Sequence, residues 1–229
     1  RDFCLSRGLG DVYKRQALDI AASMLKAGSY KYALVIGSEK MSEIVNWKDR
    51  SVCVLFGDGA GAVVLKAVDN NTEDVTGALV GHERGIIDSN IYNDGTGASV
   101  LTGGRRFSDS CSTDIFIHMD GQEVFKFAVK SVPTAIETLL HNNNMDINEV
   151  DKFILHQANV RIIESVAKRL KADKDKFPVN LNEYGNTSSA SIPILLDELN
   201  RNGSLKQGEK LVLAGFGAGL SWGSILLVW

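Results

Sequence analysis

The sequence predicts an α/β fold built from two copies of one unit, with the first copy incomplete. Segments whose apolar residues recur at helical spacing alternate along the chain with short, continuous apolar runs that are typical of buried strands. A succession of helix, glycine and strand around Gly28 recurs around Gly203, 175 residues later. In both copies a glycine-rich segment and a further apolar run follow, so the repeat extends beyond a single motif.

The first copy begins with a helix from Ala17 that ends before Gly28, because apolar residues recur there at helical spacing and glycine commonly terminates a helix. Strands are expected at 32–36, 52–56 and 62–65. The first of these is a continuous apolar run, which predicts burial on both faces. The segment Gly57–Gly61 is expected to form a tight turn between the other two strands.

The second copy follows a polar, glycine-rich stretch at 69–113, which we expect to be rich in loops with short strands. A regular block starts near residues 115–117. Helices are expected at 125–140, 160–170 and 192–199, and strands at 153–155, 211–214 and 224–228.

Residues 1–16 lack helical or strand periodicity, and the patterned sequence starts at Ala17. We therefore expect a non-native leader at 1–16, with a natural flexible leader as the alternative. The rest of an N-terminal half and its connection are then expected at 17–110, and a C-terminal half at 111–229.

Charge and composition exclude several classes of protein. Lys and Arg number 25 against 28 Asp and Glu, a net charge of −3, which argues against nucleic acid or an anionic membrane as the main partner. No run approaches the roughly 20 apolar residues of a membrane span, and no signal peptide is visible, so we expect a cytoplasmic protein.

The motifs for metals, disulfides and dinucleotides are absent. Cys4, Cys53 and Cys111 form no C-x-x-C pair, and the four histidines show no metal-ligand spacing. The segment Gly57–Gly61 is not a dinucleotide fingerprint, because its spacing differs and no helix follows. We expect no metal and no cofactor, and interpret these glycines as sites where the backbone closely approaches a ligand or another strand.

Two segments of the second copy carry candidate catalytic residues. His156, in Leu155-His-Gln-Ala-Asn159, follows a predicted strand, and α/β folds bind ligands at that end of the strand. A buried histidine with its hydrogen bonds satisfied is the structural alternative. Asn186 begins Asn-Thr-Ser-Ser-Ala-Ser191 before a predicted helix, where its amide could stabilise a developing anion or simply cap the helix.

The four motifs together resemble one family, β-ketoacyl-acyl-carrier-protein synthase III, from Ala17 to Trp229. They are His156-Gln-Ala-Asn159, Gly185-Asn-Thr-Ser-Ser-Ala-Ser191, Phe56-Gly-Asp-Gly-Ala-Gly61 and Gly217-Ala-Gly-Leu-Ser-Trp-Gly223. The resemblance implies the thiolase-like fold, two duplicated α/β halves in α-β-α-β-α layers, of which this chain would hold the C-terminal two-thirds.

The resemblance also implies a decarboxylative Claisen condensation that initiates fatty-acid synthesis. An acyl group, commonly acetyl, passes from coenzyme A to a cysteine; malonyl-acyl carrier protein then loses CO₂, and the carbanion attacks the acyl thioester. His156 and Asn186 would stabilise the enolate, and the Ala218 N–H would serve as the oxyanion donor. Arg50 and Asn159 would contact coenzyme A, and Leu55, Phe56 and Met119 would line the acyl pocket.

The resemblance further implies partners. Lys126, Arg161, Lys168 and Arg169 would dock acyl carrier protein, although ordinary solvated charges are the alternative. Coenzyme A thioesters and a second copy of the chain, in a homodimer, are the other expected partners.

One departure from the family concerns the nucleophile. The register of the family motif places the catalytic cysteine at Asp11, and subtracting the repeat offset from Asn186 gives the same position. Cys4 lies seven residues too early. We therefore expect the chain to lack its nucleophile and to be inactive in the full condensation. The alternatives are another thiolase-like acyl-CoA enzyme, such as a hydroxymethylglutaryl-CoA synthase or a polyketide starter enzyme, and a cysteine-less partner subunit.

Overall fold

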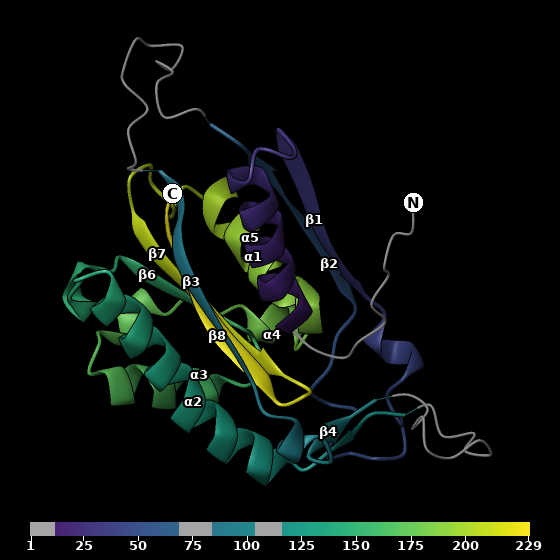
Figure 1. The fold of residues 1–229 in the computed structure, drawn as a ribbon. Coiled ribbons are helices and arrows are strands. Elements are labelled where there is room, and N and C mark those ends of the chain that lie inside the picture. Colours follow the sequence, from purple (N-terminus) through teal and green to yellow (C-terminus); the bar gives the residue numbers. More distant parts are fainter. Residues whose placement is uncertain (1–11, 69–83, 104–115) are drawn as a thin grey trace.

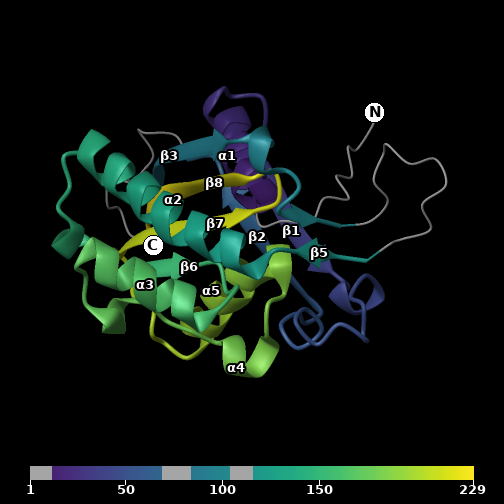
Figure 2. The same cartoon turned by 90° about the horizontal axis from the view of Figure 1, so that it is seen from below.

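The computed structural model describes residues 12–68, 84–103 and 116–229, which stack in four layers, α-β-α-β (Figures 1 and 2). Helices α2 (Gly121–Asn142) and α3 (Val160–Leu170) cover one face of a four-stranded sheet. Helices α1 (Val12–Lys26) and α5 (Ser191–Arg201) lie between its other face and a two-stranded sheet. The fifth layer of the expected fold, an outer layer of helices, is not formed by the residues described.

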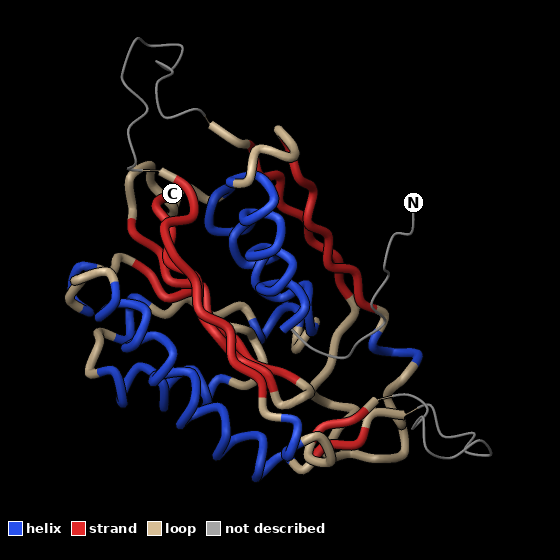
Figure 3. The backbone as a smooth tube through the Cα atoms, viewed as in Figure 1, coloured by secondary structure: helices blue, strands red, loops and turns tan. Residues whose placement is uncertain are grey.

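The four-stranded sheet, seen as the red strands between two groups of blue helices in Figure 3, has the order β3-β8-β7-β6. Strand β6 (Lys152–Leu155) runs parallel to β7 (Lys210–Gly217), while β8 (Ser221–Val228) is antiparallel to both β7 and β3 (Gly85–Asn93). Every residue of β7 after Lys210 is buried, because helices cover both faces of this strand. Two apolar cores result, one between the sheet and α2–α3 and the other between the sheet and α1–α5.

The expected helices of the second copy are confirmed as α2, α3 and α5, and its strands as β6, β7 and β8. In the first copy, β1 (Tyr32–Glu39) and β2 (Gly59–Lys66) are confirmed. Helix α1 begins at Val12, five residues before the expected start. The short elements are β4 (Leu101–Thr102), β5 (His118–Met119) and α4 (Leu181–Tyr184). Among the residues described, no helix is long and apolar enough to cross a membrane.

The structure confirms the internal repeat. Gly28 and Gly203 follow α1 and α5, and both adopt a φ of 74°. In each copy the glycine N–H donates to the carbonyl three residues earlier, and the next N–H donates to the carbonyl five residues earlier. This is the terminating arrangement that a left-handed glycine allows. Each helix then leads into an antiparallel pair of eight-residue strands, β1–β2 and β7–β8.

Three expectations for the first copy are wrong. Leu34 and Ile36 are each 60% exposed, because within the described part of the chain β1 pairs only with β2 and turns alternate side chains away from α1 and α5. Residues 52–55 form turns instead of a strand, since Val52 and Cys53 both donate their N–H to the Asp49 carbonyl, and Phe56 makes only an isolated parallel bridge with Asn186. The expected turn at 57–61 is in part strand, because β2 already begins at residue 59.

The nine-residue strand β3 lies in the stretch expected to be rich in loops. Its central residues, Asp88, Ser89 and Asn90, are polar and conceal the strand pattern. They are tolerated because Asp88 accepts a hydrogen bond from Asn143, Ser89 donates to Asp19, and Asn90 bonds the backbone of α2 and β8. The expected boundary at 110/111 therefore does not separate the two sheets, because β3 belongs with β6, β7 and β8.

Candidate active site

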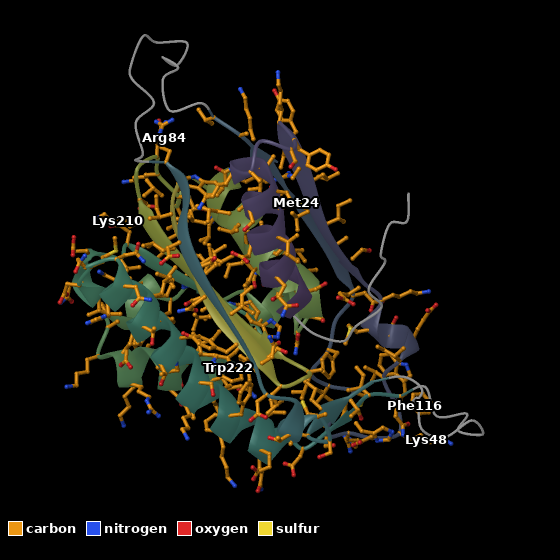
Figure 4. The ribbon with its side chains drawn as sticks, in the orientation of Figure 1. Met24, Lys48, Arg84, Phe116, Lys210 and Trp222 are labelled. Atoms are coloured by element: carbon orange, nitrogen blue, oxygen red, sulfur yellow. The ribbon has the colours of Figure 1, made fainter. Side chains whose placement is uncertain are left out.

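A cavity of about 160 Å³ lies beside the carboxyl ends of β6 and β7 and the N-terminal ends of α2 and α3. Figure 4 labels Trp222 near this end of the sheet and Lys210 at the opposite end. The lining is mainly apolar, with polar groups from His156, Asn159, Asn186 and two serines. The lining residues are Met41, Ser51, Leu55, Phe56, Leu101, Ile117, Met119, Gly121, Val124, Phe125, His156, Ala158, Asn159, Ile162, Asn186, Ser188, Phe216 and Gly217.

His156 directly follows β6, as expected, and lines the cavity. Its backbone N–H donates to the Ala214 carbonyl at 2.8 Å, which continues the pairing of β6 with β7. The side chain is only 6% exposed and meets the ring of Phe216 edge-on, with 5.5 Å between ring centroids. Its Nδ1 lies 2.7 Å from the Ser191 Oγ. His156 is thus both a buried, hydrogen-bonded residue and a cavity residue.

Asn186 joins the two copies of the repeat. Its N–H donates to the Leu55 carbonyl at 2.8 Å, and its own carbonyl accepts the Gly57 N–H at 3.0 Å. The side-chain Oδ1 accepts the Ser188 N–H at 2.9 Å. Because Oδ1 is occupied, the Nδ2 amide is the donor that Asn186 can offer to a ligand in the cavity.

Glu39, at the end of β1, holds the turn that follows Asn186. The hydroxyls of Ser188 and Ser189 both donate to the Glu39 carboxylate. Ser188 is a buried non-glycine residue with a φ of 49°, a conformation that needs support from its surroundings. The alternative interpretation of this motif as a cap for the next helix is wrong for α5, because its N-terminus has no side-chain cap.

The glycines of the first copy allow close packing of the backbone, but not against the ligand or strand that was expected. A Cβ added at Gly57 would lie 2.1 Å from the Tyr184 carbonyl oxygen. A Cβ at Gly59 or Gly61 would lie 2.9 Å from a side-chain atom of α5. The close approach is therefore to the segment carrying Asn186 and to the helix behind it.

The structure brings together most of the other residues singled out from the sequence. Leu55, Phe56 and Met119 all line the cavity, as does Asn159, whose Oδ1 also caps α3 by accepting the Arg161 N–H at 2.9 Å. Arg50 is exposed and does not line the cavity, but it adjoins Ser51, which does. Ala218 follows the lining residue Gly217. Their roles toward coenzyme A, acyl group and oxyanion stay predictions.

The four basic residues lie on two packed helices, Lys126 on α2 and the other three on α3. Lys126 is exposed and hydrogen-bonds Glu123 at 2.6 Å, and this bond, with the attraction between the charges, raises the pKa of Lys126. Arg161 stands in the first turn of α3, next to the cavity. Lys168 and Arg169 lie about 10 Å further along the helix, at 1.5 Å per residue.

Other residues of the site gave no sequence signal that distinguishes them from ordinary structural residues. Met41 comes from a short 3-10 turn, and Phe125 and Ile162 look like ordinary core positions of amphipathic helices. Gln157, inside the histidine motif, is 1% exposed and structural: its Nε2 donates to the Leu155 carbonyl and its Oε1 accepts the Asn180 N–H. Only knowledge of the folded chain shows which of these side chains reach the cavity.

The expected absence of the nucleophile stays a prediction, because Asp11, at the position where the family motif would have its cysteine, lies outside the described residues, as do Cys4 and Cys111. Cys53 is half-buried and does not line the cavity.

Comparison with known proteins decides the family. Residues 15–95 match the family described as 3-oxoacyl-[acyl-carrier-protein (ACP)] synthase III, and residues 140–229 match the C-terminal family of the same enzyme. A crystal structure of a 3-oxoacyl-(acyl-carrier-protein) synthase III is 30% identical, with a TM-score of 0.86, over 96% of this chain and 67% of that one. The chain belongs to the 3-oxoacyl-[acyl-carrier-protein] synthase III family.

Two further relatives agree with this assignment. The synthase III of Aquifex aeolicus VF5 is 41% identical, with a TM-score of 0.84, over 96% of this chain and 65% of that structure. The β-ketoacyl-[acyl-carrier-protein] synthase III of Clostridium acetobutylicum is 44% identical over 93% of this chain. The chain spans 63% of the length of that relative. The fold of this synthase III family member is therefore thiolase-like, as expected.

Proposed function

We propose that this chain performs the malonyl half of a decarboxylative Claisen condensation. The observation that carries the proposal is the placement of His156 and Asn186 in one cavity. Both side chains are less than 10% exposed, and in each a neighbour engages one polar atom, Nδ1 of His156 and Oδ1 of Asn186. We infer that the other nitrogen of each side chain donates to the same thioester oxygen, because fixed N–H donors stabilise the charge that develops on such an oxygen in the transition state.

The proposed chemistry is the loss of CO₂ from a malonyl thioester. The bond between the carboxylate carbon and the α-carbon breaks, and its electron pair passes into the thioester carbonyl to give an enolate. The two donors bind the enolate oxygen, and a proton taken from water at the α-carbon then gives the acetyl thioester as the product. The apolar lining from Met41, Phe125 and Phe216 keeps the local dielectric low, which strengthens these hydrogen bonds.

The proposal separates decarboxylation from acyl transfer. In the family the enolate attacks an acyl group held on a cysteine, whereas position 11 of this chain is aspartate. Cys53, the cysteine in the described part of the chain, does not line the cavity. We therefore infer that the chain decarboxylates a malonyl thioester without forming the acyl-enzyme or the condensation product.

The substrates and partners we propose follow the arrangement around the cavity. Arg50 and Asn159 would contact a coenzyme A thioester, with the Ala218 N–H as a further oxyanion donor. Leu55, Phe56 and Met119 would enclose an acyl chain. The basic residues of α2 and α3, Lys126, Arg161, Lys168 and Arg169, would dock acidic acyl carrier protein, and the whole enzyme would act as a cytoplasmic homodimer without a cofactor.

The proposal is tested by incubating the 229-residue chain with [3-¹⁴C]malonyl-CoA and, separately, with [1-¹⁴C]acetyl-CoA. Release of ¹⁴CO₂ above background, lost in His156→Ala, is expected, together with no stable protein-bound acetyl label. Background release that His156→Ala leaves unchanged would refute the decarboxylation. Stable labelling by acetyl-CoA would refute the separation of the two half-reactions.

A further inference from the structure

Ser191 is a buried helix-terminal serine that does not do what such serines ordinarily do. It is the first residue of α5 and only 2% exposed. A serine near a helix start usually accepts a backbone N–H of the first turn, yet α5 has no side-chain cap. The Ser191 Oγ instead lies 2.7 Å from His156 Nδ1 and 3.4 Å from the Gln157 N–H.

The hydrogen of the Ser191 hydroxyl can be assigned from these contacts. A hydroxyl carries one donor hydrogen and two acceptor lone pairs. The Gln157 N–H can only donate, so toward Gln157 the Oγ is the acceptor. Among the described residues, His156 Nδ1 is the one acceptor within hydrogen-bonding distance of the Ser191 hydroxyl. If Nδ1 carried the hydrogen and donated instead, the hydroxyl hydrogen would be buried without an acceptor.

We infer that Ser191 is a positioning residue that donates to Nδ1 of His156 and thereby holds the neutral ring as the tautomer with its hydrogen on Nε2. The hydrogen bond made by one ring nitrogen determines the protonation of the other. The inference rests on the proposed function in one respect, the role of the Nε2 hydrogen, which would be donated to the enolate oxygen.

The hydrogen bond between Ser191 and His156 also fixes the orientation of the imidazole ring, because the groups around the ring are themselves held in place. The His156 main chain is held by the Ala214 carbonyl, and Phe216 packs edge-on against the ring. Ser191 is separated from His156 by 35 residues and is anchored in α5, whose apolar side chains belong to the core beneath the sheet. A ring flip would break the bond from Ser191, so the serine holds both the tautomer and the direction of the N–H.

The direct test is long-range ¹H–¹⁵N correlation NMR of the intact chain, labelled on histidine nitrogen, at a pH where the ring is neutral. We expect the unmodified chain to show the Nε2–H tautomer of His156 and Ser191→Ala to show a mixture of tautomers. Ser165→Ala, which removes a hydroxyl that donates to the Arg161 carbonyl outside the cavity, should leave the His156 signals unchanged. An Nδ1–H tautomer in the unmodified chain would overturn the inference without the use of any variant.

A kinetic measurement adds the functional consequence. In malonyl-CoA decarboxylation, Ser191→Ala should lower kcat about tenfold and leave KM unchanged, since the donor is misdirected and the pocket is intact. Unchanged tautomer signals and unchanged kcat in Ser191→Ala would contradict a positioning role. If the unmodified chain releases no CO₂, the proposed function fails, while the NMR experiment still decides the role of Ser191.

Discussion

Asn186 shares a common local motif with Asn202 but differs from it in burial. Its Oδ1 accepts the N–H two residues later at 2.9 Å, and Asn202 makes the same bond, at the same distance, to Ser204. Asn202 is exposed at the end of α5, whereas Asn186 is 8% exposed and lines the cavity. The two residues therefore make the same hydrogen bond to the backbone, but the side chain of Asn186 lines the cavity and that of Asn202 is exposed to solvent.

This difference predicts the effect of Asn186→Asp. The substitution keeps the oxygen that accepts the Ser188 N–H, but replaces the donor with an oxygen that bears negative charge. We expect decarboxylation of malonyl-CoA to fall by about 10²–10³, the loss usual for an oxyanion donor. The rate of CO₂ release measures it, with thermal unfolding as a check on folding.

Asn202→Asp is the matched control, because it makes the same chemical change at an exposed site with the same local bond. Its activity should equal that of the unmodified chain. Equal activity of Asn186→Asp and Asn202→Asp would show that the Asn186 amide is not a donor in the reaction.

Among the helices and strands, those with a regular pattern of apolar residues could be predicted from the sequence. Helix α3 begins and ends as expected at Val160 and Leu170, because its apolar face is regular and Asn159 caps it. Strand β3 could not be found, since its central residues are polar and the partners that allow Ser89 and Asn90 to be there lie far along the chain, on α1, α2 and β8. Burial was wrongly predicted for the outer face of β1, because the hydrophobicity of a strand does not reveal which of its faces other elements cover.

The candidate site divides in a similar way. His156 and Asn186 stand in short motifs of unusual composition, so the sequence reveals them. The partners that orient them, Ser191 and Glu39, do not stand out, because a hydroxyl or a carboxylate acquires its role only when the fold brings it to the right atom.

Gly57 connects β2 with the Asn186 segment, and its replacement tests that packing. In Gly57→Ala the new Cβ would meet the Tyr184 carbonyl oxygen at 2.1 Å, and main chain cannot move aside without breaking the bonds around Asn186. We expect a loss of about 2 kcal/mol in the free energy of unfolding, measured by urea denaturation, together with reduced decarboxylation.

Gly95→Ala provides the comparison, because a Cβ there meets nothing within 4 Å. Its unfolding free energy should change by less than about 0.5 kcal/mol. A Gly57→Ala protein as stable as Gly95→Ala would mean that the close approach at Gly57 is not required.

For the whole molecule, the site lies where the two copies of the repeat meet. Backbone bonds from Asn186 to Leu55 and Gly57 cross between the copies, and Glu39 of the first copy holds the serine turn of the second. Within the second copy, an ion pair links the neighbouring strands β6 and β7. Lys152 Nζ, at the start of β6, lies 2.7 Å from the carboxylate of Glu209, the residue before β7.

This ion pair predicts a pH dependence of stability. Partial burial opposes ionisation of Glu209, but hydrogen bonds from Lys152 and the Lys206 N–H, with the charges of both lysines, lower its pKa below the ordinary 4.5. A lowered pKa in the folded state stabilises the fold above the ordinary pKa, and this contribution is lost as the pH falls below that value.

Glu209→Gln should therefore lower the Tm by about 2–4 °C at pH 7, equivalent to about 1 kcal/mol, and the difference should shrink toward pH 3. Glu43→Gln, which breaks an exposed pair with Lys40, should change the Tm little at either pH. A Tm difference for Glu209→Gln that persists unchanged at pH 3 would contradict the assigned role of the carboxylate.

The central claim is that His156 and Asn186 act together on one thioester oxygen. A double-mutant cycle tests it most directly, with malonyl-CoA decarboxylation measured for the unmodified chain, His156→Ala, Asn186→Ala and the double variant. Because both donors serve the same oxygen, each single substitution should remove most of the rate, and the double variant should be little slower than either single one. Fully additive losses, or a single variant that keeps the full rate, would contradict the claim.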